Sequence, residues 1–322
     1  MKAVIVTEQG GPEVLEISDA PEPIPGPGEI RVDVKAAGVN FLDIQQRSGS
    51  YKMTTPFVAG NEGAGVVSAI GADVTEVTVG DRVGWAMIPQ SGYAEQVLIN
   101  ADRAVALPDG IDEETAAAVL LQGLTAHYLT RSTYQVKAGD TVLVHAVAGG
   151  MGLLITQMVQ LAGGRVIGTT STEEKAEFAR SAGASDVLLS GREDLAAAVR
   201  NLTGGEGVAA VYDGLGKVTF EASLRSLRRR GTLVLYGAAS GPVPPFELHR
   251  LARGSLYVTR PGLVDYIATR AELLERAAEI FRWVEDGSLT VNIGGRYPLA
   301  DATRAHEDLA SRKTTGKLIL LT

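Results

Sequence analysis

Cysteine is absent from this chain of 322 residues, and no other feature of the composition excludes as much. Without cysteine no disulfide can form, and every metal site built on thiolate ligands is excluded. The sequence contains no apolar run of about 18 or more residues, so it predicts no transmembrane helix. The first residues, MKAVIVTEQGGPEVLEI, lack the apolar segment of about 7–15 residues that a signal peptide needs. We therefore expect a soluble, cytoplasmic protein.

An excess of positive charge is also lacking. The chain has 30 Lys and Arg against 38 Asp and Glu, which gives a formal net charge of −8. Nucleic-acid binding through phosphate contacts requires a basic surface, so no nucleic-acid partner is expected. Hydrophobic residues make up 45% and charged residues 21%, which is ordinary for a soluble globular enzyme. At this length we expect two domains, because single cores rarely grow beyond about 250–300 residues.

The first third of the chain is rich in short predicted strands. Alternating or apolar runs are separated by turns that contain glycine, proline and aspartate. Prolines at every second position of 21–27 indicate a rigid connector and not a strand interior. We expect strands at residues 3–6, 30–34, 65–70 and 94–99.

From about residue 112 the pattern changes to alternating helices and strands. A helical stretch at 112–131 precedes a series of apolar runs that are expected to be buried parallel strands. Such alternation is typical of a doubly wound α/β sheet with right-handed crossovers. The expected strands are 142–145, 165–169, 186–189, 208–213 and 232–236, and the expected helices are 151–161, 173–181, 195–202 and 219–227.

The expected fold class is therefore α/β, with a central doubly wound parallel sheet of the Rossmann type. Because this unit lies in the middle of the chain, the β-rich segment and the tail, with a helix at 270–286 and a strand at 317–321, form one discontinuous domain. We place the β-rich catalytic domain at 1–122 and 263–322, and the nucleotide-binding domain at 123–262. The cleft between two such domains is the default position of an active site.

A glycine-rich turn follows the first strand of the central domain. The strand leads directly into AVAGGMG at 146–152 and then into an apolar helix. Glycines let the backbone approach a pyrophosphate closely, and a helix N-terminus supplies N–H groups and a positive dipole end. The strict G-x-G-x-x-G pattern is not met, because Val147 stands at its first glycine. The position between a buried strand and a helix favours dinucleotide binding over a plain tight turn.

The end of the second strand indicates which dinucleotide binds. NAD sites place an acid about 20 residues after the glycines to bind the ribose 2′-hydroxyl. Here the segment is GTTST at 168–172, with no acid before Glu173. Small hydroxyl residues and Lys175 suit a 2′-phosphate, although Lys175 alone is equally well explained as a solvated helix lysine. The missing acid favours NADPH.

Several motifs together carry a family resemblance. They are GGPEVLEI near the start, AAGVNFLDIQQRSGSY at 36–51, GNEGAGVV at 60–67, QGLTAHYL at 122–129 and HAVAGGMGLLITQMVQ at 145–160. With RGTLVLYGAASG at 230–241 and GSLYVTRP at 254–261, they cover essentially the whole chain. The sequence resembles the NADPH:quinone oxidoreductases, the zeta-crystallin-like, zinc-free branch of the medium-chain dehydrogenase/reductase superfamily. This resemblance implies a Rossmann domain beside a GroES-like catalytic domain.

The resemblance also implies functional positions. Asn40, Tyr51 and Thr125 resemble the residues that line the nicotinamide end of the site, and they are the implied catalytic residues. The glycine turn resembles the pyrophosphate site, and Ser171 and Lys175 resemble the 2′-phosphate contacts. The implied cofactor-binding set is Asn40, Thr125, Gly149, Gly150, Met151, Gly152, Ser171, Lys175, Ser190, Arg192, Gly237, Arg312 and Lys317.

Four members of that set have open interpretations. Ser190 stands where the family commonly has a tyrosine, and Arg192 is an alternative contact at that place. Arg312 and Lys317 resemble basic residues of the family tail that close over the cofactor. They are equally well explained as ordinary surface residues.

A zinc site is not expected. Catalytic zinc usually has three Cys, His or carboxylate ligands and an open position. Zinc alcohol dehydrogenases have a cysteine where this chain has Asn40, and a Gly-His-Glu where it has GNE at 60–62. The histidines lack metal-ligand spacing, and His145 is better explained as a residue that packs against or orients the loop. The four histidines are His127, His145, His249 and His306.

The expected reaction is one that the cofactor performs nearly alone. Hydride passes to an electron-poor acceptor while the protein supplies orientation and a dry pocket. A quinone fits because its reduced oxygen develops negative charge, which Asn40 and Tyr51 would stabilise as hydrogen-bond donors. Tyr51 or water would deliver the proton, although Tyr51 is equally well explained as a residue that fills the mouth of the cleft.

Two other functions remain open from the sequence. Reduction of the activated C=C bond of an enal or enone would use the same hydride geometry. A structural role, like that of lens crystallins that bind NADPH, would combine tight binding with negligible turnover. The resemblance also implies a homodimer, since the apolar, strand-like segment 255–259 would otherwise be an exposed sheet edge.

Overall fold

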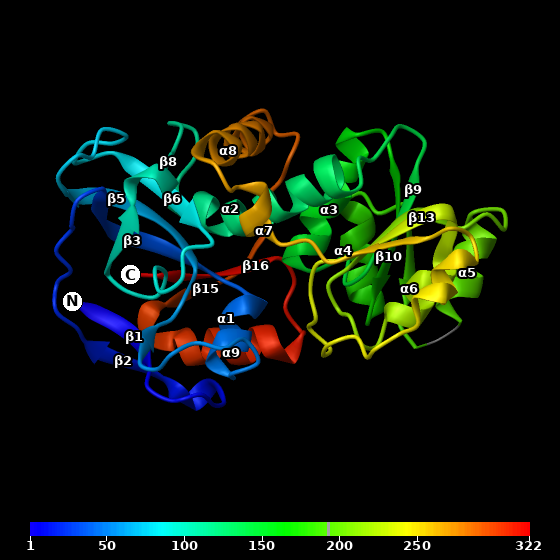
Figure 1. Ribbon diagram of the computed structural model, residues 1–322, viewed down its shortest axis with the longest axis horizontal. Coiled ribbons are helices and arrows are strands. Elements are labelled where there is room, and N and C mark those ends of the chain that lie inside the picture. The colour runs from blue at the N-terminus through cyan, green and yellow to red at the C-terminus, as the bar shows by residue number, and fades with distance from the viewer. Residues whose placement is uncertain (192–193) are drawn as a thin grey trace. The chain divides into compact units, whose positions relative to one another are not determined.

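The computed structural model describes residues 1–191 and 194–322, and it divides into two compact units. The first unit comprises Met1–Leu124 and Ile267–Thr322, and the second comprises Thr125–Tyr266. The helix α2 (Glu113–Tyr128) crosses this division. Figure 1 follows the chain from blue to red through the elements of both units.

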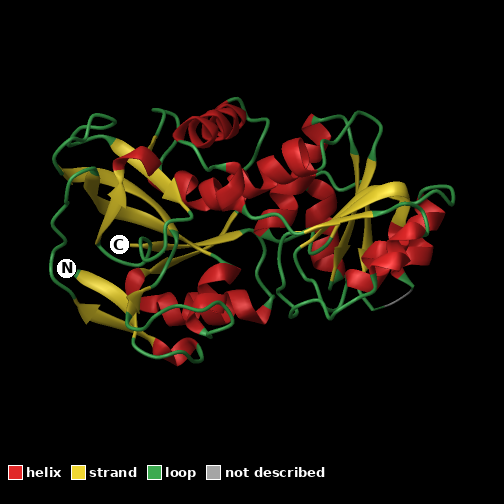
Figure 2. Ribbon diagram, in the orientation of Figure 1, coloured by secondary structure: helices red, strands yellow, loops and turns green. Residues whose placement is uncertain are grey.

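The second unit contains a six-stranded parallel sheet with strand order β11-β10-β9-β12-β13-β14. This order corresponds to 3-2-1-4-5-6, the doubly wound arrangement that binds dinucleotides. Helices connect the strands and lie on both sides of them (Figure 2). The strands are β9 (Thr141–Val144), β10 (Arg165–Thr170), β11 (Asp186–Leu189), β12 (Val208–Asp213), β13 (Leu227–Leu235) and β14 (Tyr257–Thr259), and the helices are α3 (Gly150–Leu161), α4 (Glu173–Ser181), α5 (Leu195–Leu202), α6 (Phe220–Ser226) and α7 (Leu263–Tyr266).

The strand order reverses between β9 and β12, which are hydrogen-bonded neighbours. In open α/β sheets, ligands bind outside the carboxyl ends of the strands at such a switch point. The glycine-rich turn follows β9 and therefore lies at that point. The sheet interior is apolar, with Leu143, Ile167 and Val211 fully buried.

The first unit contains two sheets. The smaller is antiparallel, with order β2-β1-β4, and the larger has seven strands in the order β15-β16-β3-β5-β6-β8, with β7 also paired to β3. The strands are β1 (Lys2–Val6), β2 (Leu15–Asp19), β3 (Glu29–Val39), β4 (Phe57–Val58), β5 (Glu62–Ile70), β6 (Arg82–Ala86), β7 (Gln96–Asn100), β8 (Val105–Ala106), β15 (Ile293–Pro298) and β16 (Lys317–Leu321), and the helices are α1 (Phe41–Arg47), α8 (Arg270–Glu285) and α9 (Ala302–Ser311).

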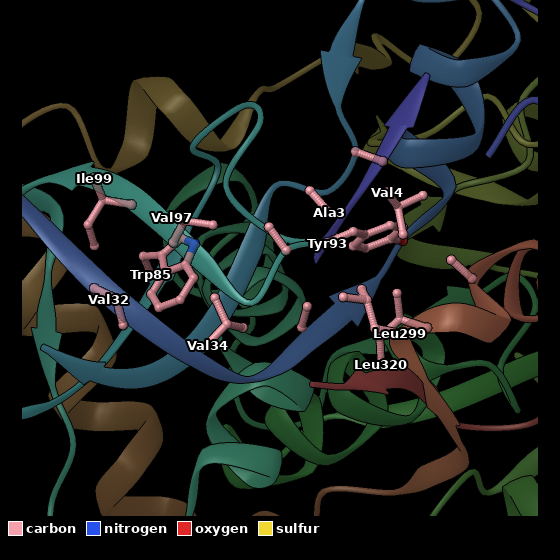
Figure 3. Packing of buried hydrophobic residues seen from close by; sticks show 14 of the residues in the cluster. Ala3, Val4, Val32, Val34, Trp85, Tyr93, Val97, Ile99, Leu299 and Leu320 are labelled. Carbon is pink, nitrogen blue, oxygen red and sulfur yellow. The ribbon is translucent and has the colours of Figure 1, made fainter. Parts of the chain in front are cut away.

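The core of the first unit joins segments from both ends of the chain. Figure 3 shows Val4, Tyr93, Leu299 and Leu320 packed in one buried apolar cluster. Burial of this kind stabilises the fold by about 25 cal/mol per Å² of apolar surface removed from water. The tail is thus part of the first unit's core, and this arrangement brings β16 beside β3.

The expected α/β class, with a Rossmann sheet and a separate β-rich unit, is confirmed. Among the described residues, no helix is both long and apolar enough to cross a membrane.

Candidate functional site

The turn after β9 has the geometry of a phosphate-binding loop. Gly149 is the N-cap of α3, and the Leu153 N–H donates to the Gly149 carbonyl at 2.9 Å. The N–H groups that precede Leu153 in the first turn of α3 have no acceptor within the helix, as at any helix N-terminus. A Cβ on Gly152 would lie 2.5 Å from the Ala146 carbonyl oxygen, so only glycine permits this close approach. The turn can therefore present backbone donors and a dipole end to a pyrophosphate.

Val147, which replaces the first glycine of the strict pattern, has a specific place in the packing. Its side chain is fully buried. It lies against Gly168 of β10, where an added Cβ would be 2.5 Å from Val147 Cγ1. The glycine on the neighbouring strand thus provides the space for the larger residue in the turn.

The carboxyl end of β10 brings three of the expected cofactor residues into one region. Ser171 is exposed and follows β10, and the Ser190 N–H donates to the Thr170 carbonyl at 2.8 Å. Thr172 caps α4, and its hydroxyl accepts the Lys175 N–H at 3.3 Å. Partial burial lowers the pKa of Lys175, and the charge of Glu174 opposes this shift. Arg192 lies outside the described residues.

A buried hydrogen-bond network lies at the ends of β9, β10 and β12. His145 Nδ1 lies 2.9 Å from Thr169 Oγ1, and His145 Nε2 lies 2.8 Å from Ser223 Oγ. Ser223 donates its hydroxyl proton to Asp213 Oδ2 at 2.9 Å. The Ser223 oxygen must therefore accept from His145 Nε2, so Nε2 is the ring nitrogen that carries the proton. Burial lowers the pKa of His145, against the opposing charge of Asp213. This neutral imidazole therefore connects the strands on either side of the glycine turn.

Asn40 lies in a buried polar cluster of the first unit. Its Oδ1 accepts from Lys317 Nζ at 2.7 Å and from Gln122 Nε2 at 3.4 Å. Its Nδ2 donates to Glu62 Oε1 at 2.7 Å. Lys317 Nζ also donates to Glu62 Oε1, while Glu62 Oε2 accepts the Leu121 N–H at 2.9 Å. Two expected site residues, Asn40 and Lys317, are thus in direct contact.

The position of Lys317 contradicts one of its two interpretations, that of an ordinary surface residue, and leaves the implied cofactor contact as a prediction. The family resemblance placed it over the cofactor, and the alternative placed it on the surface. Its side chain is only 2% exposed and is paired with Glu62, whose side chain is fully buried. The difference arises because Lys317 begins β16, an interior strand of the larger sheet.

A second buried network supports the backbone of Asn40. Asp43 Oδ2 accepts the Asn40 N–H at 2.7 Å and the Tyr93 hydroxyl at 3.0 Å, and Asp43 Oδ1 accepts Asn61 Nδ2 at 2.5 Å. Burial raises the pKa of Asp43 to about 6, although the Asn61 hydrogen bond opposes this shift. Asn61 also exchanges two amide hydrogen bonds with Gln46. Asp43 therefore fixes the chain where β3 turns into α1.

The remaining expected residues take part in none of the hydrogen bonds described above. Tyr51 is 54% exposed, and among the described residues no hydrogen bond joins it to Asn40. Thr125 lies on α2, three residues after Gln122. Gly237 follows β13 at the carboxyl edge of the parallel sheet. Arg312 is exposed and ends α9 in a left-handed conformation, with φ of 58°.

Sequence reasoning did not single out Glu62, Asp43 or Gln122 as functional residues. A signal was present for Glu62 and Lys317, because each stands at the head of an apolar strand. A charge in that position needs a buried partner, since an unpaired buried charge is costly. The sequence alone could not indicate that the two are each other's partner.

No group of three or more His, Cys, Asp or Glu side chains within residues 1–191 and 194–322 could hold a metal ion. The place where zinc dehydrogenases have cysteine and histidine is taken by Asn40 and Asn61. Both amides are engaged in the hydrogen bonds given above.

Comparison with known proteins agrees with this architecture. Residues 26–136 match the alcohol dehydrogenase GroES-like domain, and residues 150–279 match the zinc-binding dehydrogenase domain. A quinone oxidoreductase of Pseudomonas aeruginosa is 46% identical over 99% of both chains. A 2-haloacrylate reductase of a Burkholderia species is 39% identical over 99% of this chain and 98% of its own. A mycobacterial protein solved in complex with NADPH is 52% identical over 100% of both chains, with a TM-score of 0.97.

A Rossmann sheet with a glycine turn at its switch point, combined with a GroES-like unit, defines the medium-chain dehydrogenase/reductase class of oxidoreductases. Within that class, the full-length sequence identity to the quinone oxidoreductase of Pseudomonas aeruginosa identifies the family. The chain belongs to the quinone oxidoreductase family.

Proposed function

We propose that this protein is an NADPH-dependent quinone reductase that works without a metal. Full-length similarity to a quinone oxidoreductase carries the proposal. The NADPH complex of the mycobacterial relative supports the choice of cofactor. The absence of cysteine from the chain, and the hydrogen-bonded Asn40 and Asn61, support the zinc-independent part.

The residues of the second unit fit NADPH. The first turn of α3 supplies N–H donors for the pyrophosphate, and Gly152 leaves the backbone accessible. Ser171, Ser190 and Lys175 gather around the end of β10, where hydroxyl and ammonium donors suit a 2′-phosphate. No acid precedes Glu173 in this segment, so no carboxylate stands where NAD sites bind the ribose 2′-hydroxyl.

The bound cofactor supplies hydride, and the side chains orient and stabilise the acceptor. Asn40 is held with Nδ2 donating to Glu62, which leaves a second N–H that can donate to an acceptor oxygen as negative charge develops there. Tyr51 is exposed and carries a hydroxyl that can donate a proton. Thr125 and the cofactor residues other than Asn40 and Lys317 keep their proposed roles, and Asn40 is assigned here to the acceptor oxygen.

The experiment measures NADPH oxidation by the purified protein at the nicotinamide absorbance. Quinones, enals, enones and 2-haloacrylates serve as acceptors, and each assay is repeated with NADH and with a chelator. We expect turnover with quinones that prefers NADPH and is unchanged by the chelator. Loss of activity with the chelator would contradict the metal-free assignment. Tight NADPH binding without turnover of any acceptor would indicate a crystallin-like binding role instead.

A second candidate is reduction of an activated C=C bond. The Burkholderia relative, named 2-haloacrylate reductase, favours it. The same Asn40 donor would stabilise the enolate oxygen that forms when hydride adds to the β-carbon of an enone or enal. Turnover confined to the alkenes in the same panel would establish this function in place of quinone reduction.

The proposal also includes an organisation of the protein. NADPH binding is assigned to the central domain at 123–262, and catalysis to the β-rich domain at 1–122 and 263–322. A homodimer formed through the edge strand β14 is part of the proposal, because Tyr257 on that strand is 59% exposed. A cytoplasmic location is also proposed, since a chain without cysteine gains nothing from an oxidising compartment.

A further inference from the structure

The cluster around Asn40 contains a complete buried ion pair. The Glu62 carboxylate accepts from Lys317 Nζ, Asn40 Nδ2 and the Leu121 N–H. Its side chain is fully buried, and that of Lys317 is 2% exposed. Removing one member of such a pair leaves an uncompensated buried charge. The fold therefore buries both charges as a pair, and each of them is hydrogen-bonded to the side-chain amide of Asn40.

Three adjacent strands build this cluster. β16 and β5 flank β3, and Leu318 is paired with Val39, so Lys317 lies opposite Asn40 at the end of the ladder. Gly38 of β3 provides the space for the carboxylate. A Cβ there would meet Glu62 Oε1, and it would lie 2.5 Å from Glu62 Cδ and 2.6 Å from the Ala117 carbonyl oxygen.

The charges fix the orientation of the Asn40 amide. An ammonium can only donate and a carboxylate can only accept, so Oδ1 must face Lys317 and Nδ2 must face Glu62. A flipped amide would put its NH₂ against the ammonium and its oxygen against the carboxylate. One Nδ2–H donates to Glu62. Because the amide group is planar, the direction of the other Nδ2–H is then determined as well. An ammonium on the amide oxygen also draws electron density from the nitrogen, which strengthens that N–H as a donor.

We propose that Lys317 is a positioning residue for the reductase reaction, which orients and polarises Asn40 as the donor to the acceptor oxygen, and that it does not contact the cofactor. This inference rests on the proposed function for the role of Asn40. It assigns Lys317 an effect on the chemical step and none on NADPH affinity. The acceptors that benefit are those whose oxygen gains negative charge on hydride addition, such as quinones and enones.

A double-mutant cycle tests the proposal. Lys317→Met, Asn40→Ala and the double variant are compared with the wild type for kcat, KM and the dissociation constant of NADPH. The acceptor is whichever one the wild type reduces. We expect Lys317→Met to lower kcat at least tenfold with NADPH affinity within twofold. The double variant should be no slower than Asn40→Ala, because the lysine acts through the asparagine. Lys313→Met, a change of an exposed lysine in the same tail, is the matched control.

Two results would overturn the assignment. A tenfold loss of NADPH affinity with unchanged kcat would make Lys317 a cofactor contact. A double variant whose kcat loss equals the product of the two single losses would show that the two residues act independently.

Gly38→Ala provides a second route if Lys317→Met does not fold. It displaces the Glu62 carboxylate without deleting a charge, so it should reproduce the loss of kcat with NADPH affinity unchanged. Gly262→Ala is its control, since an added Cβ there has its nearest neighbour, Asp265 Oδ2, at 3.8 Å. Full activity of a folded Gly38→Ala protein would contradict the proposal.

A measurement without turnover separates this proposal from the proposed function. The side-chain amide signal of Asn40, identified by its loss in Asn40→Ala, should show slow hydrogen exchange in the wild type and fast exchange in Lys317→Met or Gly38→Ala. Equal exchange in all folded variants would overturn the positioning role. A wild type that reduces no acceptor but shows this difference would overturn the proposed function alone.

Discussion

Asp43 and His306 are both buried in the first unit, and burial shifts their pKa values in opposite directions. It raises the pKa of Asp43 to about 6 and, with the nearby charge of Arg47, lowers the pKa of His306 to about 3. Tyr93 connects them, since its oxygen lies 3.0 Å from both Asp43 Oδ2 and His306 Nε2. At neutral pH the carboxylate can only accept, so Tyr93 donates to Asp43 and accepts from His306.

These shifts contribute to stability with opposite signs. His306 is neutral in the fold, so its contribution is complete above pH 6.5 and is lost as the pH falls toward about 3. The Asp43 carboxylate destabilises the fold fully above about pH 6, and this penalty is relieved as the pH falls toward 3.8. Between these limits the two groups oppose each other, which flattens the acid response of the wild type.

Replacing His306 with Gln should remove the histidine contribution to the pH dependence of the free energy of unfolding and leave that of Asp43. The wild type binds fewer protons at this site than its unfolded chain does, and the variant has no such difference. The free energy of unfolding of the wild type relative to His306→Gln should therefore fall by about 2 kcal/mol between pH 6.5 and pH 5. Urea unfolding at the two pH values measures it. The control is His249→Gln, since the His249 side chain is 77% exposed. An equal pH response in the wild type and His306→Gln would contradict the assignment.

Lys175 carries a prediction about cofactor preference. Replacing it with Gln removes a positive charge beside the proposed 2′-phosphate position, which NADH lacks. We expect NADPH to bind about tenfold more weakly, or ~1.4 kcal/mol, with NADH binding unchanged. Titration of the intrinsic fluorescence with each dinucleotide provides the two dissociation constants. Lys137→Gln, at an exposed position of the same unit, is the control. An equal loss of affinity for NADPH and NADH would show that Lys175 does not lie beside the 2′-phosphate.

At the scale of elements, the carboxyl ends of β9, β10 and β12 are connected by side chains as well as by the ladder. Thr169, His145 and Ser223 form a continuous chain of hydrogen bonds that ends on Asp213. Asp213 also accepts the N–H groups of Leu215 and Gly216. The chain fixes the strand ends on both sides of the switch point.

Ser223→Ala should therefore be more destabilising than its size suggests. It leaves the buried His145 Nε2–H without an acceptor, which costs about 1–3 kcal/mol. Urea unfolding at pH 7 measures the loss. Ser226→Ala is the matched control, because Ser226 lies on the same helix and its hydroxyl donates to the Ala222 carbonyl of its own turn. Similar losses for the two variants would show that the network adds nothing to the sheet.

Most elements of the second unit could be predicted from the sequence. The expected strand at 208–213 and helix at 195–202 agree with β12 and α5 residue for residue. Buried parallel strands are short continuous apolar runs, whereas crossover helices repeat their apolar residues with the helical period, so the local pattern distinguishes them there. In the first unit, β15 and α9 were not expected, and β3 begins and ends beyond the predicted 30–34. Pairing with distant strands determines those limits.

The candidate site was only partly predictable for the same reason. Asn40 and Lys317 are 277 residues apart, and their contact depends on the pairing of β16 with β3. A family pattern can mark each position, but local sequence carries no information about which two residues meet. The charges of Glu62 and Lys317 at the heads of apolar strands were a signal for buried partners that the sequence analysis did not use, and only the sheet identifies those partners.

At the scale of the whole molecule, the edge strand β14 leads to a prediction about the oligomeric state. β14 ends the six-stranded sheet beside β13, with Tyr257 exposed, and an unprotected strand edge is a template for pairing. Val258→Asp should therefore convert the proposed dimer to a monomer. Size-exclusion chromatography with light scattering measures the mass. Val218→Asp, at a 69% exposed position, should leave the mass unchanged. A monomeric wild type would refute the dimer.

The position of β16 between β15 and β3 has a consequence for biosynthesis. Residues 317–321 are translated after every other residue of their sheet, and Lys317 follows Glu62 by 255 positions. At a translation rate of about 5–20 residues per second, Lys317 is synthesised roughly 13–50 s after Glu62. Until then the Glu62 carboxylate has no lysine partner. During that time the second unit, which is contiguous in the chain, can already fold. The proposed oxyanion donor is thus assembled last, so a nascent chain can acquire a nucleotide-binding unit well before it is able to catalyse anything.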